Sequence, residues 1–206
     1  MKILIATFNK GKQLEHKGIL LRLAKKTNKD LTIVLPEDLG IRDKVEETGK
    51  TFEDNSLLKA KLYFERSGVP AIADDGGLEI PVLNNEPGVL SRRWLGYEAD
   101  DEKLITYTLK RLEKYKRKED RRAYLTVCVT YYDGKRMFQE TEKIDGYIAE
   151  KASPNYIKGY PFRALFIVLP LEKYLDKLTT EEHAKYNHRE KALSRLWEKI
   201  VFMYNK

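Results

Sequence analysis

Two adjacent carboxylates followed by two glycines are the residues with the clearest potential for chemistry in this chain. Residues 69–73 form a short apolar run, typical of a buried strand, and Asp74, Asp75, Gly76 and Gly77 follow it. Open α/β sheets bind ligands beyond their strand ends, and glycines allow a sharp turn and a close approach of substrate. Because successive strand side chains point to opposite faces, only one aspartate is easily directed into a given cleft. Asp-Gly is also common in turns, so a plain turn is the alternative interpretation.

Polar residues near the start of the chain form a second candidate site. The apolar residues 2–6 predict a short strand, and Thr7, Asn9 and Lys12 lie between this strand and a helical pattern. The N-terminus of a helix favours an anion, especially a phosphate. Lys12 would add a positive charge, and Thr7 or Asn9 a neutral hydrogen bond. The spacing is not that of a Walker loop, and a plain turn with Asn9 as N-cap is the alternative.

A predicted helix carries the third group of polar residues. The helix extends from an N-capping Thr51 to a C-terminal Gly68, and Asp54 lies in its first turn. The helix dipole alone would favour an acid there. Lys59 follows Asp54 by about one turn, so the two side chains could face the same cleft. Asp54 and Asp75 together suit Mg²⁺, which takes one or two protein carboxylates plus substrate phosphates.

The elements that must position these residues indicate an α/β protein with a mixed sheet. Further strands are predicted at residues 31–35 and 163–169, a β-hairpin at 123–148 around Asp133-Gly134, and helices at 101–118 and at the C-terminal end, with another helix start near Leu178. No apolar run is long enough to cross a membrane.

The composition suits a single globular domain, or one domain with two lobes. The only cysteine, Cys128, excludes an intramolecular disulfide and a cysteine metal cluster, which fits a reducing cytoplasm. The first apolar run is too short for a signal peptide. The net charge of +7 suggests polyanionic partners. That indication is weak, because many basic residues lie in mixed-charge runs such as 110–122, which are usually solvated.

Five motifs, taken in their order, resemble one enzyme family. They are Thr7-x-Asn9-x-x-Lys12, Thr51-Phe-Glu-Asp-Asn55 with Lys59, Ala73-Asp-Asp-x-Gly-Leu78, Pro87-Gly-x-x-Ser91-x-Arg93 and His188-Arg189. Over nearly the whole chain this resembles the inosine/xanthosine triphosphate pyrophosphatases, the Ham1 family. The resemblance implies one ITPase-like domain over residues 1–206, with an elongated mixed sheet flanked by helices and a central cleft between two lobes. It further implies a cytoplasmic homodimer that uses Mg²⁺ to hydrolyse ITP, dITP and XTP to the monophosphate and pyrophosphate.

The resemblance also implies a role for each matched residue. Asp54 and Asp75 would bind Mg²⁺, and Asp75 would activate the attacking water. Lys59 would contact phosphate. The residues expected to bind other parts of the substrate are Thr7, Asn9, Lys12, Gly76, Ser91, Arg93, Phe162, Arg163, His183, His188 and Arg189. These roles agree with the needs of phosphoryl transfer, which are charge neutralisation and alignment. Asp54 stands where the family usually has Glu, and this shortens its reach by one methylene.

The base-binding segment departs most from the family pattern. Arg163 replaces an acid, Phe162 replaces an aromatic residue that usually carries a hydroxyl, and His183 and Asn187 replace a lysine and a serine. Arginine only donates hydrogen bonds, and it matches the O6 and N7 acceptors of an oxopurine. We expect either that Arg163 reads this edge, or that it points out of the pocket and base selectivity is poor.

Two other functions remain open on the sequence. A pyrophosphatase of the Maf type, acting on pyrimidine or modified nucleotides, is the first. A non-catalytic nucleotide or nucleic-acid binder, suggested by the net charge and by Arg92-Arg93, is the second. Against a binder, carboxylates gather where phosphates should lie, which makes sense only with a metal. A nucleoside triphosphate is therefore the expected partner, and neither nucleic acid nor a membrane is.

Overall fold

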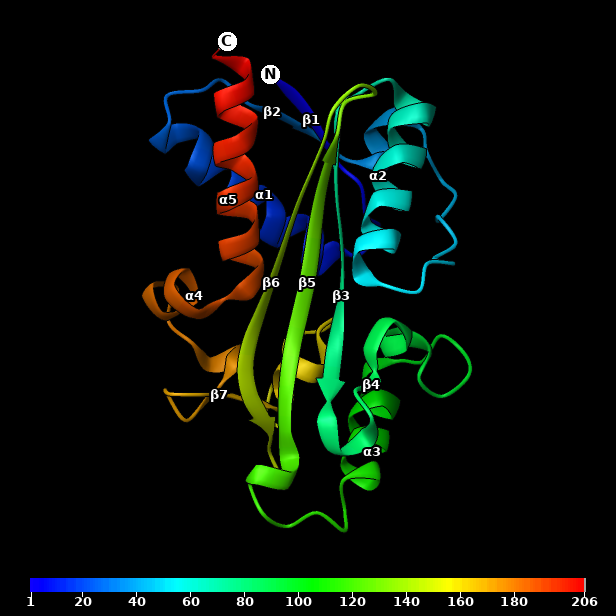
Figure 1. The fold of residues 1–206 in the computed structure, drawn as a ribbon, viewed down its shortest axis with the longest axis vertical. Helices are drawn as coiled ribbons and strands as arrows, with labels where there is room; N and C mark the ends of the chain where they lie inside the picture. Colours follow the sequence, from blue (N-terminus) through cyan, green and yellow to red (C-terminus); the bar gives the residue numbers. More distant parts are fainter. Residues whose placement is uncertain (206) are drawn as a thin grey trace. The chain divides into compact units, whose positions relative to one another are not determined.

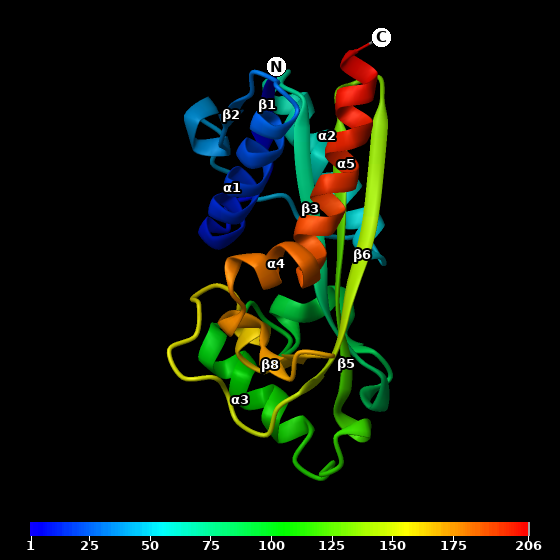
Figure 2. The same cartoon turned by 90° about the vertical axis from the view of Figure 1, so that its left-hand side faces the viewer.

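The computed structural model describes residues 1–205 as an open mixed sheet flanked by helices (Figures 1 and 2). The strand order is β2-β1-β3-β5-β6-β7-β8, with β4 beside β3. The strands are β1 (Lys2–Ile5), β2 (Thr32–Val34), β3 (Ala71–Ile80), β4 (Glu86–Pro87), β5 (Arg122–Tyr132), β6 (Met137–Ile148), β7 (Phe166–Val168) and β8 (Lys173–Tyr174). The helices are α1 (Lys10–Lys26), α2 (Phe52–Ser67), α3 (Asp101–Arg111), α4 (Thr180–Tyr186) and α5 (His188–Tyr204).

The contacts divide the chain into two compact units. The first contains residues 1–75, 127–142 and the chain from Arg189 onwards, and the second contains 76–126 and 143–188. Strands β3, β5 and β6 contribute residues to both units. In the first unit β1 pairs in parallel with β2 and β3, whereas in the second β7 is antiparallel to β6 and β8. The predicted α/β class with a mixed sheet is confirmed.

The first unit has an apolar core on each face of its sheet. In β1, Ile3 and Ile5 pack into a cluster with residues of α1 and α5. Leu4, together with Ala6 just after the strand, packs into a cluster with residues of α2. Figure 1 shows α2 on the opposite side of these strands from α1 and α5. The strand is buried on both faces, as is usual for a parallel strand covered by helices. Any two consecutive side chains in this part of the sheet therefore meet different helices.

Strand β3 continues through the two aspartates and the two glycines. It extends over Ala71–Ile80, so the strand does not end at residue 73 as predicted, and the alternative of a plain turn at Asp-Gly is also wrong. Residues Leu78 and Ile80 are fully buried in the core of the second unit, and this burial favours an extended chain on both sides of the glycines. Asp74 and Asp75 are therefore buried mid-strand residues rather than loop residues.

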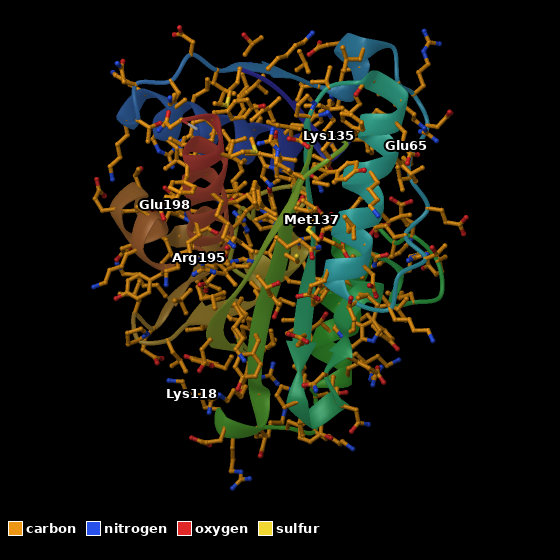
Figure 3. The ribbon with its side chains drawn as sticks, turned by 45° about the horizontal axis from the view of Figure 1, so that its top comes forward. Glu65, Lys118, Lys135, Met137, Arg195 and Glu198 are labelled. Atoms are coloured by element: carbon orange, nitrogen blue, oxygen red, sulfur yellow. The ribbon has the colours of Figure 1, made fainter. Side chains whose placement is uncertain are left out.

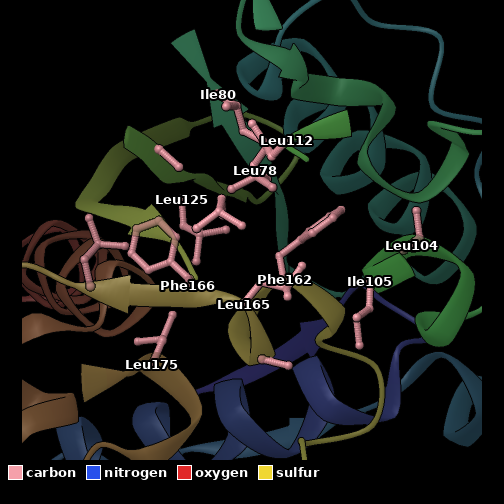
Figure 4. Close-up of a cluster of buried hydrophobic side chains, with 14 of the residues drawn as sticks. Leu78, Ile80, Leu104, Ile105, Leu112, Leu125, Phe162, Leu165, Phe166 and Leu175 are labelled. Atoms are coloured by element: carbon pink, nitrogen blue, oxygen red, sulfur yellow. The ribbon is translucent and has the colours of Figure 1, made fainter. Parts of the chain in front are cut away.

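The second unit is built on one apolar core (Figure 4). Helix α3 contributes Leu104 and Ile105 to it, and fully buried Leu112 follows the helix. The helix predicted at 101–118 ends early, at Arg111. Buried Arg121 explains the early end, because its guanidinium donates to the backbone carbonyl of Leu112 at 3.0 Å. A carbonyl held in this way is capped by a side chain instead of by a further helical turn.

The predicted strand at 163–169 is also partly wrong. Residues Pro161–Ala164 form a 3₁₀ helix, and β7 covers only Phe166–Val168. Proline at the first position favours a helical start because its φ is fixed near the helical value. Other predictions are confirmed: Thr51 caps α2, Gly68 ends it, and β5 and β6 are neighbours joined through Asp133-Gly134.

Helix α5 is fixed to the first unit by both polar and apolar contacts. Trp197 is almost fully buried and donates its indole N–H to the Thr27 hydroxyl at 3.0 Å. Arg195, labelled in Figure 3, donates to the Glu140 carboxylate of β6 at 2.8 Å. These contacts hold the backbone of α5 in place, and Arg189 lies in the first turn of this helix. Among residues 1–205, no helix has both the length and the apolar character that a membrane crossing requires.

Two glycine-to-alanine substitutions in the first unit should have opposite effects on stability. Gly18 lies inside α1, and an added Cβ would meet only Arg22 Nη1 at 3.7 Å, an ordinary contact. Gly68 closes α2 with φ of +66°. We expect Gly18→Ala to raise the free energy of unfolding by about 0.5–1 kcal/mol, and Gly68→Ala to lower it by about 1 kcal/mol. Urea unfolding of both variants checks this, and a shared sign would contradict it.

Candidate active site

The carboxylate of Asp74 lies on the face of β3 that α1 and α5 cover. Its Oδ2 atom is 3.1 Å from Lys12 Nζ of α1, and 3.1 Å from both Nε and Nη2 of Arg189 of α5. The remaining guanidinium nitrogen, Nη1, donates to Glu15 at 3.0 Å. Burial alone would raise the pKa of Asp74, but Lys12 and Arg189 outweigh it and hold the pKa well below its usual range. Asp74 is therefore a permanently charged group that ties two helices to one strand.

The carboxylate of Asp75 lies on the opposite face and contacts α2. Its Oδ1 accepts a hydrogen bond from Lys59 Nζ at 3.0 Å, and its Oδ2 accepts one from the Asn55 side chain at 3.2 Å. Lys59 also donates to Glu47 Oε1 at 2.6 Å. One buried ammonium group thus joins two carboxylates that are far apart in the sequence.

The electrostatics of this second cluster differ from those around Asp74. Burial raises the pKa of Asp75, and the attraction of Lys59 only partly offsets this effect. Burial lowers the pKa of Lys59, but Asp75 and Glu47 more than reverse this and raise it. The ammonium therefore stays protonated, while Asp75 has a stronger tendency to take up a proton than an exposed aspartate. Raised basicity is what a carboxylate needs to accept a proton from water.

The loop after β1 is ordered by its own hydrogen bonds. Asn9 is the N-cap of α1, as in the alternative interpretation, and its side chain accepts from the Lys12 backbone N–H at 3.1 Å. The Thr7 hydroxyl accepts from the Asn9 N–H at 3.2 Å, and Gln13 donates to the Thr7 carbonyl at 2.8 Å. Capping does not remove a phosphate-binding role, because other N–H groups of the first turn stay available.

Asp54 differs from Asp75 in being exposed. It lies in the first turn of α2, where its backbone N–H donates to the Thr51 hydroxyl at 3.0 Å. Within residues 1–205, no group of three or more His, Cys, Asp or Glu side chains is arranged to hold a metal. Pairs of carboxylates such as Asp54 and Asp75 supply the hard oxygen ligands that suit Mg²⁺, which commonly takes its other ligands from phosphate and water. Their joint binding of Mg²⁺ stays a prediction.

The predicted site residues fall into both units. The first unit contains Thr7, Asn9, Lys12, Asp54, Lys59, Asp75 and Arg189, and the second contains Gly76, Ser91, Arg93, Phe162, Arg163, His183 and His188. Ser91 accepts from the Leu78 N–H at 3.1 Å and donates to the Gly88 carbonyl at 2.7 Å, so it ties the 3₁₀ helix Gly88–Arg93 to β3. Gly76 lies in β3 itself, and Arg93 ends the 3₁₀ helix.

The base-binding segment lies in the second unit. Phe162 packs into the apolar core of this unit, and the buried Arg163 guanidinium lies 4.0 Å from the centre of the Tyr160 ring. His183 is in α4, with its Nδ1 atom 3.4 Å from the Asn187 side chain. Arg163 is thus buried in the folded chain. Whether it faces the base stays a prediction.

Four residues in the two clusters have roles that the sequence interpretation missed. They are Glu15, His16, Glu47 and Asn55. Glu15 and His16 follow Lys12 by three and four positions, which places them next to it on a helix face. Asn55 directly follows Asp54 in the Thr51–Asn55 motif, and its place in the sequence does not indicate a contact with Asp75. Glu47 lies in an irregular segment, where no periodicity could have pointed to it.

Known proteins resemble this chain in both sequence and structure. The Ham1 family model matches residues 3–199. The chain is 34% identical to a dITP/XTP pyrophosphatase of Leptospira interrogans, covering 95% of this chain and 94% of the relative. It is 36% identical to a dITP/XTP pyrophosphatase of Thermus thermophilus, covering 96% and 91%. The structure of the Staphylococcus aureus Ham1 protein superposes with a TM-score of 0.80 at 28% identity, covering 98% of this chain and 100% of that one. The chain belongs to the Ham1 family.

Proposed function

We propose that this protein is a Mg²⁺-dependent nucleoside triphosphate pyrophosphatase that hydrolyses dITP, ITP and XTP to the monophosphate and pyrophosphate. The observation that carries the proposal is the buried cluster in which Lys59 bridges Asp75 and Glu47. A structural ion pair needs only one carboxylate. The additional carboxylate suits a site that handles a metal and a polyanion together. The two relatives described above carry the matching activity in their names.

In the proposed reaction Asp75 accepts a proton from the attacking water. The water oxygen forms a bond to the α-phosphorus, the bond from this phosphorus to the α–β bridging oxygen breaks, and pyrophosphate leaves. Burial raises the pKa of Asp75, which strengthens it as a base. Lys59 orients the carboxylate through its hydrogen bond to Oδ1 and places positive charge beside the phosphates.

The triphosphate would lie against the first turn of α1. Lys12 and the backbone N–H groups there would neutralise and align the phosphates. Asp54 and Asp75 would hold Mg²⁺, and Glu47, which accepts from Lys59, would add a further negative charge nearby. When bound, the ion would neutralise charge on the phosphate oxygens and help to align the water for attack.

The base would be read by residues of the second unit, among them Arg163, His183 and His188. Arg163 would donate to the O6 and N7 acceptors that inosine and xanthine share with guanine. We also propose that the protein acts in the cytoplasm as a homodimer. Light scattering coupled to size-exclusion chromatography tests the dimer.

A substrate panel tests the function. The folded protein is incubated with Mg²⁺ and ITP, dITP, XTP, GTP, ATP, UTP, dTTP or CTP, and pyrophosphate release is followed. We expect the three nonstandard purine nucleotides to give the highest kcat/KM. Preference for a pyrimidine nucleotide would favour a Maf-type activity instead. Absence of pyrophosphate with every nucleotide would refute the proposal.

Asp75→Asn should remove the base and a metal ligand while keeping the side-chain shape. We expect kcat for dITP to fall roughly 10³-fold, the range of a lost general base. Asp133→Asn is the matched control, because Asp133 is an aspartate of the same unit whose carboxylate accepts from Lys135 and Arg136 in its own turn. Retained turnover in Asp75→Asn, with circular dichroism showing a folded protein, would exclude Asp75 from the mechanism.

Asp54→Asn should affect the metal more than the fold. Asp54 is exposed, so we expect an unchanged melting temperature but about a tenfold rise in the Mg²⁺ concentration for half-maximal rate. Asp120→Asn, at a half-buried surface aspartate whose carboxylate accepts from Arg117, is the control. Chelation by EDTA should abolish turnover, and Mg²⁺ should restore it. An unchanged Mg²⁺ requirement in Asp54→Asn would remove Asp54 from the metal site.

Arg163→Ala tests base reading. If the guanidinium donates to the oxopurine edge, the ratio of kcat/KM for ITP over ATP should fall about tenfold or more. Arg163→Lys keeps the charge but loses the two-pronged geometry, so it should recover little of the ratio. Equal losses for ITP and ATP would show that Arg163 supports the fold of its segment rather than selectivity.

A further inference from the structure

The two carboxylate oxygens of Asp74 differ in their contacts, and the oxygen with fewer contacts lies near a histidine. Oδ2 receives the contacts from Lys12 and Arg189. Oδ1 has no hydrogen-bond partner in the described part of the chain, and His16 Nε2 lies 3.7 Å from it. This separation exceeds the usual N–H···O distance of ~2.9 Å by about 0.8 Å. A small movement would therefore join the two groups.

His16 has unused hydrogen-bonding capacity. Its side chain is fully buried in α1, and neither ring nitrogen has a hydrogen-bond partner within residues 1–205. Burial lowers the pKa of His16 to about 4, although Asp74 opposes this, so the imidazole is neutral at pH 7 and carries one N–H. Buried polar groups in native proteins nearly always have a partner. An imidazole and a carboxylate oxygen that both lack a hydrogen bond among the described residues and lie 3.7 Å apart therefore require an explanation.

Lys12 provides one. Its side chain is 18% exposed, whereas that of Arg189, the other cation on Asp74, is 6% exposed. Lys12 also lies in the first turn of α1, at the end suited to phosphate. If Lys12 turns to a substrate phosphate, Asp74 loses a charged partner while it stays buried. An undercompensated buried carboxylate is costly, so another donor must approach.

We propose that His16 is a positioning residue that donates Nε2–H to Asp74 Oδ1 when Lys12 leaves Asp74 for the substrate. The new bond keeps Asp74 in place, and with it Arg189 and the neighbouring Asp75. His16 touches no reacting atom in this scheme. The inference rests on the phosphate-binding role of Lys12 in the proposed function.

Nuclear magnetic resonance of ¹⁵N-histidine-labelled protein tests this without turnover. The chain has three histidines, and the His16 signals are assigned by their loss in His16→Leu. In Lys12→Met the lysine is permanently absent, so we expect a hydrogen-bonded, downfield-shifted Nε2–H of His16 without any ligand. The unsubstituted protein is also studied with Mg²⁺ and an ITP analogue that cannot be hydrolysed, because a methylene group joins its α- and β-phosphorus atoms. We expect the same shift of the His16 signal when this analogue is added.

Unchanged His16 signals in Lys12→Met overturn the proposal, whether or not the protein hydrolyses any nucleotide. A shift in Lys12→Met, but none in the analogue-bound protein, overturns the transfer of Lys12 to substrate and so the proposal. Loss of pyrophosphate release in the substrate panel is a separate result that concerns the proposed function alone.

Kinetics give a second readout. His16→Leu removes the donor at similar size, and we expect kcat/KM to fall about tenfold, as for a lost hydrogen bond to a charged group. The melting temperature should not fall, because leucine replaces an unpartnered buried group. His16→Gln, which can donate, should recover most of the loss. Leu20→Met on the same helix is the packing control. Equal kinetics in His16→Leu and the unsubstituted protein overturn the proposal.

Discussion

Successive side chains of an extended strand point to opposite faces, and in β3 this constraint acts on two adjacent carboxylates. Asp74 shares its face with Ile72 and meets α1 and α5, whereas Asp75 shares its face with Ala73 and meets α2. Neither carboxylate can stay charged in a buried strand without cations. Each helix therefore has to bring a basic residue to its own side of the sheet. The positions of Lys12, Lys59 and Arg189 follow from this requirement.

The two faces compensate charge in different ways. On one, Lys12 and Arg189 both reach one oxygen of Asp74 and outweigh the effect of burial on its pKa. On the other, Lys59 serves both Asp75 and Glu47, so burial still raises the pKa of Asp75. A strongly held carboxylate suits a structural anchor, and a weakly compensated one suits proton transfer or metal binding. The surroundings of two neighbouring aspartates thus suit them to different purposes.

The sequence alone predicted most of the helices and the α/β class, because Thr51, Asn9 and Gly68 are strong local signals. It also separated Asp74 from Asp75 by strand alternation. The path of β3 through Gly76 and Gly77 was not predictable in this way, because it depends on the burial of Leu78 and Ile80 in the core of the second unit. The early end of α3 depends on Arg121, a residue that becomes a helix cap only after folding. Glu47 was missed for the same reason, since only the folded chain places it beside Lys59.

The division between the two aspartates can be measured directly through the free energy of unfolding at pH 7. Burial disfavours the charged form of Asp75, so Asp75→Asn should change stability by less than about 1 kcal/mol. The folded state favours the charged form of Asp74, and its removal leaves Lys12 and Arg189 undercompensated, so Asp74→Asn should lower stability by about 3 kcal/mol or more. Urea titrations of both variants give these values. Equal losses of stability, or a larger loss in Asp75→Asn, would contradict the assignment of Asp74 as anchor and Asp75 as the chemical group.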